Sequence, residues 1–429
     1  MRAMKDSGVE WIGEMPKLWA QVPVKKLAIF INGFAFSSDW LSPEASYPVI
    51  RIGDIGDNGS IDFAHALGVA VADNLTGFTI QKNDILIAMS GATTGKVGFV
   101  KNNPPTSFIN QRVGIIRSDK YNKYLFYCLS TNVFKEYVSL LAAGSAQPNL
   151  STEGIKNYKV MCPPENELDE IIKYLDQQCS EIDKVLAKTR ESIDEYKKLK
   201  QSVITEAVTK GIRPDRPMKP SGIEWIGDIP EEWEVRPMKS LGVYRNGLTY
   251  APENVVDSDS GILVLRSSNI QRGRIELEDN VFVDQEIPEQ LRVKAGDILI
   301  CSRNGSRDLI GKNAIIPENL NASFGAFMMI FRCQFPQYIY YILNSTVFAY
   351  YLGSFLTATI NQLTGKNFGS MNVVFCPDDN ERQEIVAYLD RQCAEIDRLI
   401  AKKEQIITEL EGYKKSLIYE CVTGKLEVE

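Results

Sequence analysis

The residue types that usually build metal centres and catalytic sites are scarce in this sequence. Histidine occurs once among 429 residues, as His65, and none of the eight cysteines forms a CxxC pair. A zinc site of the usual cysteine and histidine spacing is therefore not expected. Catalysis of the Ser-His-Asp or Cys-His kind would have to use His65, which stands in DFAHALG without a serine or cysteine beside it. We expect His65 near the surface and the cysteines reduced and buried.

Long apolar runs are also missing. Residues 333–365 carry no Asp, Glu, Lys or Arg, but polar residues such as Asn344 and Asn361 interrupt the stretch. A membrane-spanning helix needs about 20 predominantly apolar residues in a row. This region therefore predicts a buried helix followed by a loop, in a cytoplasmic protein with no membrane partner.

Two motifs come close to known binding loops without matching them. GATTGKVG, from Gly91 to Gly98, has three residues between its first two glycines, where a phosphate-binding loop needs four, and Val97 follows Lys96. NNPPT is similar to the NPPY-type motif of amino-methyltransferases, but Thr106 replaces the aromatic residue that would stack on a base. We expect a strand–turn–strand and a proline turn at these places. No residue is expected to be catalytic or to bind a metal or cofactor.

The net charge of −7 excludes a uniformly basic DNA-binding protein. The charge is unevenly distributed, because residues 17–159 contain 14 basic and 10 acidic residues. Residues 165–211 contain 8 basic and 11 acidic, and residues 378–429 contain 8 and 13. The acidic excess lies in these last two segments, so the regions between them can present positive faces.

The chain is a tandem duplication with an offset of 214 residues. KDSGVEWIGEMPKLW recurs as KPSGIEWIGDIPEEW with 9 of 15 positions identical, and EIIKYLDQQCSEID recurs as EIVAYLDRQCAEID with 10 of 14 identical. Landmarks of the diverged regions still align, such as Asp84-Ile-Leu-Ile with Asp297-Ile-Leu-Ile, and Arg51 with Arg266. Such repetition is typical of one structural unit used twice.

Each copy contains a long segment with the pattern of an amphipathic helix. Apolar residues recur in alternating steps of four and three from Leu168 to Tyr196 and from Val386 to Leu410. This heptad seam predicts two long helices that pack on each other. The alternative is that each helix packs only on its own domain. Short runs such as VGIIR and MMIFR predict strands in the mixed regions between them.

The SGxEWIGxxP segments, the GDILI-like strand and the YLDxQxxxID helix openings together resemble the DNA-specificity subunits of type I restriction–modification systems. The resemblance covers essentially the whole chain, twice, although NEL and NERQ stand where the family often carries an EQ pair. It implies an α+β fold, a pseudo-twofold tandem repeat with two mixed globular target-recognition domains separated by two long helices in an antiparallel coiled coil. The expected boundaries are 1–164 for the first domain, 165–211 for the first spacer helix, 212–377 for the linker and second domain, and 378–429 for the second helix.

The resemblance also implies a function. Each domain would read one half of a bipartite, asymmetric site in double-stranded DNA, and the helices would be the spacer and the docking surface for two modification subunits. Methylation, and cleavage where restriction subunits join, would belong to those partners, which would bring S-adenosylmethionine, ATP and magnesium. The duplication agrees with this reading, since a repeated frame lets one asymmetric chain hold two identical partners.

Reading base edges requires Arg, Lys, Asn and Gln with Ser or Thr in support. The candidate DNA-binding residues of the first copy are Arg51, Ser90, Thr93, Thr94, Lys96, Asn110, Gln111, Arg112, Gln147 and Asn149. Those of the second copy are Arg266, Ser268, Asn269, Gln271, Arg272, Arg274, Arg303, Asn304, Arg307, Lys312, Asn361 and Gln362. Two other functions stay open: a coiled-coil scaffold that does not bind DNA, and a fused methyltransferase, against which the missing cofactor loop argues.

Overall fold

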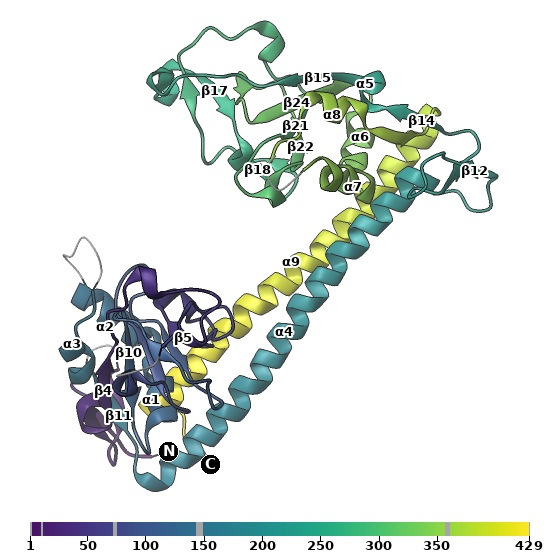
Figure 1. Cartoon of the computed structure of the whole chain (residues 1–429). Helices are drawn as coiled ribbons and strands as arrows, with labels where there is room; N and C mark the ends of the chain where they lie inside the picture. Colours follow the sequence, from purple (N-terminus) through teal and green to yellow (C-terminus); the bar gives the residue numbers. More distant parts are fainter. Residues whose placement is uncertain (1, 10–11, 72–74, 143–148, 357–360, 429) are drawn as a thin grey trace. The chain divides into compact units, whose positions relative to one another are not determined.

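The computed structural model describes residues 2–9, 12–71, 75–142, 149–356 and 361–428. It forms two compact units, the first from residues 1–189 and 405–429, the second from residues 190–404 (Figure 1). Both units contain sheets and helices, so the chain has the α+β fold expected from the sequence.

The first unit is built on an antiparallel four-stranded sheet of order β4-β10-β7-β8. A smaller sheet has the order β6-β5-β9, and β1–β2 and β3–β11 form separate pairs. The strands are β1 (Met4–Asp6), β2 (Glu14–Pro16), β3 (Ala20–Pro23), β4 (Ile29–Asn32), β5 (Tyr47–Ile50), β6 (Gly68–Val69), β7 (Ile85–Ala88), β8 (Val97–Phe99), β9 (Phe108–Ile109), β10 (Val113–Arg117) and β11 (Lys159–Cys162). Its helices are α1 (Asn122–Leu129), α2 (Asn132–Ala142), α3 (Thr152–Asn157), the first part of α4 (Glu165–Lys210) and the last part of α9 (Asp379–Thr423).

The position of the central strand β7 explains why its residues are all apolar and do not alternate with polar ones. Ile85 and Ile87 face the core that includes α1 and the long helices, while Leu86 and Ala88 face a second, smaller core. A strand covered on both faces reads as a continuous apolar run. Just before it, the buried Asp84 accepts hydrogen bonds from Nε and Nη2 of Arg117 on β10, both at 2.7 Å.

The second unit repeats this plan. Its main sheet has the order β15-β24-β21-β22, and further strands form the sheets β16-β20-β17-β23, β12–β13, β14–β25 and β18–β19. Its strands are β12 (Met218–Pro220), β13 (Asp228–Pro230), β14 (Glu234–Pro237), β15 (Gly242–Asn246), β16 (Val255–Val256), β17 (Ile262–Leu265), β18 (Ile270–Gln271), β19 (Arg274–Ile275), β20 (Phe282–Val283), β21 (Ile298–Cys301), β22 (Asn313–Ile315), β23 (Ala322–Phe324), β24 (Met328–Cys333) and β25 (Asn372–Phe375). Its helices are α5 (Met238–Leu241), α6 (Pro336–Ile342), α7 (Thr346–Phe355), α8 (Gly365–Ser370) and the remaining parts of α4 and α9.

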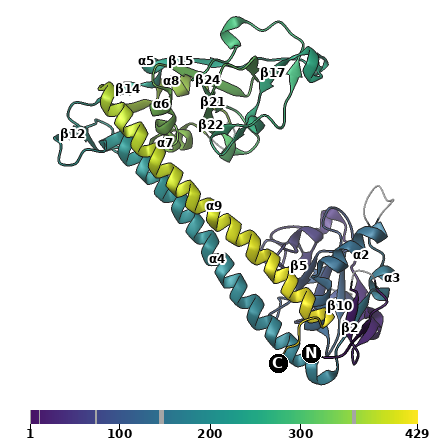
Figure 2. The ribbon, with the colours of Figure 1, turned by 180° about the vertical axis from the view of Figure 1, so that it is seen from behind.

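The long helices pack on each other and on the domain cores at the same time. In the first unit, Leu175 of α4 and Leu417 of α9 belong to one core with the α1 side chains. In the second unit, Lys200 contacts Asp397 at 2.7 Å and Lys403 lies over the ring of Tyr196. Residues with higher numbers in α4 contact residues with lower numbers in α9, so the two helices are antiparallel (Figure 2). The predicted helix pairing is confirmed, and the reading in which each helix packs only on its own domain is wrong.

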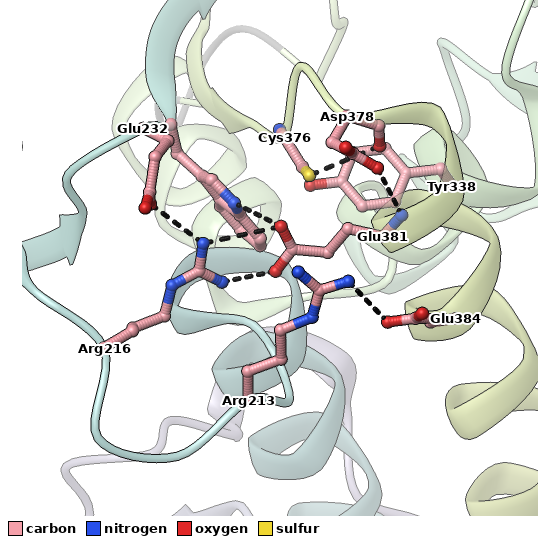
Figure 3. Close-up of polar contacts among 9 residues, drawn as sticks. Arg213, Arg216, Glu232, Tyr338, Cys376, Asp378, Glu381 and Glu384 are labelled. Carbon is pink, nitrogen blue, oxygen red and sulfur yellow. Dashed lines mark hydrogen bonds and ion pairs between the residues drawn. The ribbon is translucent and has the colours of Figure 1, made fainter.

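The repeated opening segments hold the starts of these helices. In the second unit, the buried carboxylate of Glu381 accepts hydrogen bonds from Arg216 and from the indole of Trp233, and the backbone N–H of Glu381 donates to Asp378 at 2.8 Å (Figure 3). In the first unit, Glu167 accepts from Arg2 and from the indole of Trp19, both at 2.9 Å. Trp19 and Trp233, which end the two duplicated segments, are therefore structural, because each is buried against the first turn of a long helix.

Several smaller predictions are also confirmed. VGIIR and MMIFR form strands β10 and β24, and GATTGKVG connects β7 to β8 as a strand–turn–strand. His65 is exposed and its ring lies 2.9 Å from Asp62. None of the described helices is both long and apolar enough to cross a membrane. The region from residue 333 contains two helices, α6 and α7, where one buried helix followed by a loop was expected.

Candidate nucleic-acid interface

Each unit presents a short turn that begins with an arginine. In the first unit Arg51 follows β5, and its backbone N–H donates to the carboxylate of Asp54 at 2.8 Å. In the second unit Arg266 follows β17, and its N–H donates to the side-chain oxygen of Asn269 at 2.9 Å. The same local hydrogen bond fixes both turns. Both arginine side chains are partly exposed.

A second loop of the first unit lies beside this turn. It runs from Ser90 to Lys96 and is closed by the hydrogen bond from the Gly95 N–H to the Ala88 carbonyl at 2.8 Å. The ammonium of Lys96 lies 2.7 Å from Asp57, which follows the arginine turn. This hydrogen bond, and then the charge of Lys96, lower the pKa of the Asp57 carboxyl. Ser90 also forms a β-bridge with Asn149, so a third segment joins the same surface.

The second unit assembles the equivalent surface. The amide of Asn304 donates to the hydroxyl of Ser267 at 3.2 Å, and Lys312 lies 3.4 Å from the Ser267 carbonyl. Arg303 forms a β-bridge with Gln362, as Ser90 does with Asn149. The guanidinium of Arg303 lies 5.1 Å from the ring centre of Phe327, which is an exposed aromatic side chain. Segments far apart in the sequence therefore meet at one polar, cationic surface in each unit.

These loops contain polar atoms that the protein itself does not satisfy. Among the described residues, six buried side-chain polar atoms have no hydrogen-bond partner, and five of them belong to the loops. The five are Ser90 Oγ, Thr93 Oγ1, Ser268 Oγ, Arg266 Nε and Arg51 Nε, the last of which lies 3.6 Å from the Asp54 carboxylate without a hydrogen bond. An unsatisfied buried polar group costs about 1–3 kcal/mol. A polar ligand that approached these atoms would recover this cost.

The remaining candidate residues do not all face this surface. Arg272 is exposed, has a positive φ of 49° and lies 3.6 Å from Glu404 of α9. Asn269 is fully buried, and its amide donates to the carbonyls of Glu276 and Asp279. We therefore leave Arg272 and Asn269 out of the proposed interface.

Some of the other candidates form local hydrogen bonds, and the rest are described by their position. Arg307 donates to the carbonyl of Leu356 at 2.9 Å, and Gln271 donates to that of Ser268. The carbonyl of Arg112 accepts from the Met89 N–H at 2.8 Å, which places the segment of Asn110, Gln111 and Arg112 beside the Ser90 loop. Thr94 lies within that loop, whereas Arg274 is on β19 and Asn361 precedes the bridged Gln362. Gln147 lies outside the described residues.

Sequence reasoning missed Phe327 and the carboxylates that hold the helix starts. Phe327 lies in the second unit where Arg112 lies in the first, since both carbonyls accept from the residue after the central strand, Ser302 or Met89. Phe327 lies in the apolar run FGAFMMIF, so the sequence does not mark it as a surface residue. Glu167 and Glu381 occupy equivalent positions of the repeat, 214 residues apart, but the sequence does not show which residues they contact.

A cavity of about 860 Å³ opens elsewhere on the second unit, between β14, α5 and the start of α9. Arg236, Arg332 and Arg382 line it together with Phe335 and Phe375. Each of these arginines already has an acidic partner within the protein, so the cavity is not a strong anion site. Among the described residues, no group of three or more His, Cys, Asp or Glu side chains is arranged to hold a metal ion.

The fold and the paired loops define a duplicated protein with one polar, cationic loop surface in each unit. Residues 16–193 match the family described as the type I restriction modification DNA specificity domain. The chain is similar to the specificity subunits of type I restriction enzymes.

Similar proteins cover different shares of the chain. The EcoKI specificity subunit of Escherichia coli K12 is 28% identical over 207 residues, which are 47% of this chain and 44% of that protein. The MjaVIII specificity subunit of Methanocaldococcus jannaschii is 25% identical over 362 residues, or 81% and 80% of the two chains. A chain solved in a study of complex assembly and conformational transition of the type I R-M system shares the fold, with a TM-score of 0.70 at 15% identity over 96% of this chain and 99% of that one.

Proposed function

We propose that this chain reads DNA sequence for a type I restriction–modification complex, with each unit reading one half of a bipartite, asymmetric site. The unsatisfied polar atoms in the loops of both units carry this proposal. They lie beside Lys96 in one unit and Lys312 in the other. Cations next to free hydrogen-bonding groups suit a ligand with phosphates and base edges.

We also propose that the two long helices bind partner subunits. The two antiparallel helices carry the same sequence motif twice, so they offer two similar surfaces for two copies of a modification subunit. Helices of 46 and 45 residues are about 65–70 Å long at 1.5 Å per residue, a suitable length for a spacer on DNA. Methylation belongs to these partners, with S-adenosylmethionine, and cleavage to restriction subunits with ATP and magnesium. The complex would act on DNA in the cytoplasm.

Methylome sequencing tests this function. Cells that express the modification subunit are compared with and without this chain. We expect a methylated bipartite motif that appears only when both proteins are present. Copurification of the partner without any methylated motif, together with DNA binding that shows no site preference, would instead support a scaffold that does not read DNA.

A further inference from the structure

The strand pairing of the two units shows which loop residues correspond. Lys96 precedes Val97, which pairs with Ile87 of the central strand, and Lys312 precedes Asn313, which pairs with Ile300. Both lysines follow a glycine with positive φ, Gly95 at 83° and Gly311 at 88°. The two lysines therefore occupy the same structural position.

The arginine turns give a second shared position. Arg51 and Arg266 each begin a single helical turn whose third residue accepts a hydrogen bond from the arginine N–H. Each also has a carboxylate nearby, from Asp54 in one unit and from Asp279 in the other. An arginine and a lysine are thus kept at equivalent places in both loop surfaces.

The neighbouring residues differ. Ser90 corresponds to Arg303, and Asn149 corresponds to Gln362, because each pair forms the β-bridge at the end of the central strand. The loop that follows has four residues before its glycine in the first unit, 91–94, and seven in the second, 304–310. The side chains at the same bridged position therefore differ in length, charge and hydrogen-bonding pattern.

We propose that the shared cations bind DNA phosphates, whereas the bridged pairs and the loops 91–94 and 304–310 read the bases. This inference rests on the proposed function. Two units that read different half-sites cannot obtain the difference from residues that are the same in both. Phosphates are identical at every sequence, so they suit the shared cations Arg51, Lys96, Arg266 and Lys312.

The chemistry of the bridged pairs agrees with this division. Arginine binds the guanine edge with two hydrogen bonds, and asparagine and glutamine bind the adenine edge in the same way. Arg303 lies over the ring of Phe327, which limits the directions that its guanidinium can take. The shared Lys96, in contrast, pairs with Asp57, a fully exposed carboxylate. Such surface pairs are weak, so a phosphate can replace the carboxylate.

The test uses the full chain assembled with its modification partner. One variant is Lys312→Ala, and another is the double substitution R303S/Q362N, which transfers the first copy's residues to the second. The exposed Lys294, which is outside the loop surface, gives the control Lys294→Ala. Selection from randomised DNA gives the preferred site, and titrations at several salt concentrations give the salt dependence. Circular dichroism spectra and melting temperatures that match the wild type verify that each variant is folded.

For Lys312→Ala we expect an unchanged preferred site and weaker binding to all sequences. The slope of log K against log salt should become shallower by about 0.9, the value for one lost phosphate contact. For R303S/Q362N we expect changed letters in only one half-site, with discrimination at each altered base reduced about tenfold or more. Lys294→Ala should behave as the wild type.

Two results would overturn the inference while the proposed function stands. One is a changed letter in the preferred site of Lys312→Ala, which would mean that the shared lysine reads a base. The other is an unchanged site with uniformly weaker binding for R303S/Q362N. Failure of the proposed function gives a different result, because the wild-type complex itself would then select no preferred site.

Discussion

Replacing Glu381 removes the carboxylate that holds the start of α9. The resulting loss of stability can be compared with the loss caused by replacing Glu167, the equivalent residue of the first copy. The Glu381 side chain is 4% exposed and that of Arg216 is 12% exposed. Removal of one partner from a buried ion pair costs about 3–5 kcal/mol, because the other charge stays buried. Arg216 keeps its pair with Glu232 at 3.0 Å, so we expect Glu381→Ala to cost an amount at the lower end of this range. The Glu167 side chain is 25% exposed, and its partner Arg2 is 19% exposed. Water can reach this pair more easily, so we expect Glu167→Ala to cost about 1–2 kcal/mol.

The assay is urea unfolding, combined with hydrogen exchange of the peptides that cover 205–220 and 378–392 in the second unit. Glu381→Ala should lower the unfolding free energy of the second unit and speed exchange in these peptides. Glu381→Gln should have an intermediate effect, because the amide oxygen can still accept from Trp233 while the charge is lost. Glu167→Ala is the matched comparison in the other copy. Equal losses at Glu381 and Glu167, or protection unchanged in Glu381→Ala, would refute the reasoning from burial.

Two further predictions concern buried groups. Arg382 is buried over the ring of Phe335, at the place where the first copy has the buried Leu168. Arg382→Leu should therefore change the unfolding free energy by less than about 1 kcal/mol, whereas Arg382→Ala should lower it by about 2–4 kcal/mol. Urea unfolding of the two variants measures both values. A larger loss of stability for Arg382→Leu than for Arg382→Ala would contradict this prediction. Burial raises the pKa of Cys393 to about 11 and that of Cys421 to about 12. Unfolding therefore releases these thiol protons between pH 9 and those values, so stability should fall as pH rises through this window. Midpoints measured at pH 8 and pH 10.5 should fall less in C393A/C421A than in the wild type, and an equal fall would contradict the assignment.

The sequence predicted the repeated features of the fold because they depend on local patterns. The heptad seams gave the long helices, and the run Ile85-Leu86-Ile87 gave the central strand, since its two faces are buried in different cores. The sequence did not reveal how the loops come together. The contact between Lys96 and Asp57, and the bridge between Ser90 and Asn149, join segments that only tertiary packing brings together.

Tertiary contacts also explain why two candidate residues are not part of the proposed interface. Asn269 has the side chain that base reading requires, but its amide already donates to the backbone carbonyl of Glu276. Arg272 follows it by three residues, and the positive φ of Arg272 accompanies its contact with Glu404 on α9. Composition identifies residues that can bind DNA, whereas the local hydrogen bonds decide which of them are available to do so.

The central claim is that each unit reads one half-site, and exchange of the globular regions tests it most directly. In the test variant, residues 24–157 replace residues 238–371 of the second copy, and Arg382→Leu restores the residue that the first region packs against. The variant is assembled with its modification partner, and selection from randomised DNA gives its site beside that of the wild type. We predict that the asymmetric site becomes an inverted repeat of one wild-type half-site, because the helices that carry the two copies are antiparallel. An unchanged asymmetric site in a folded variant would contradict the account.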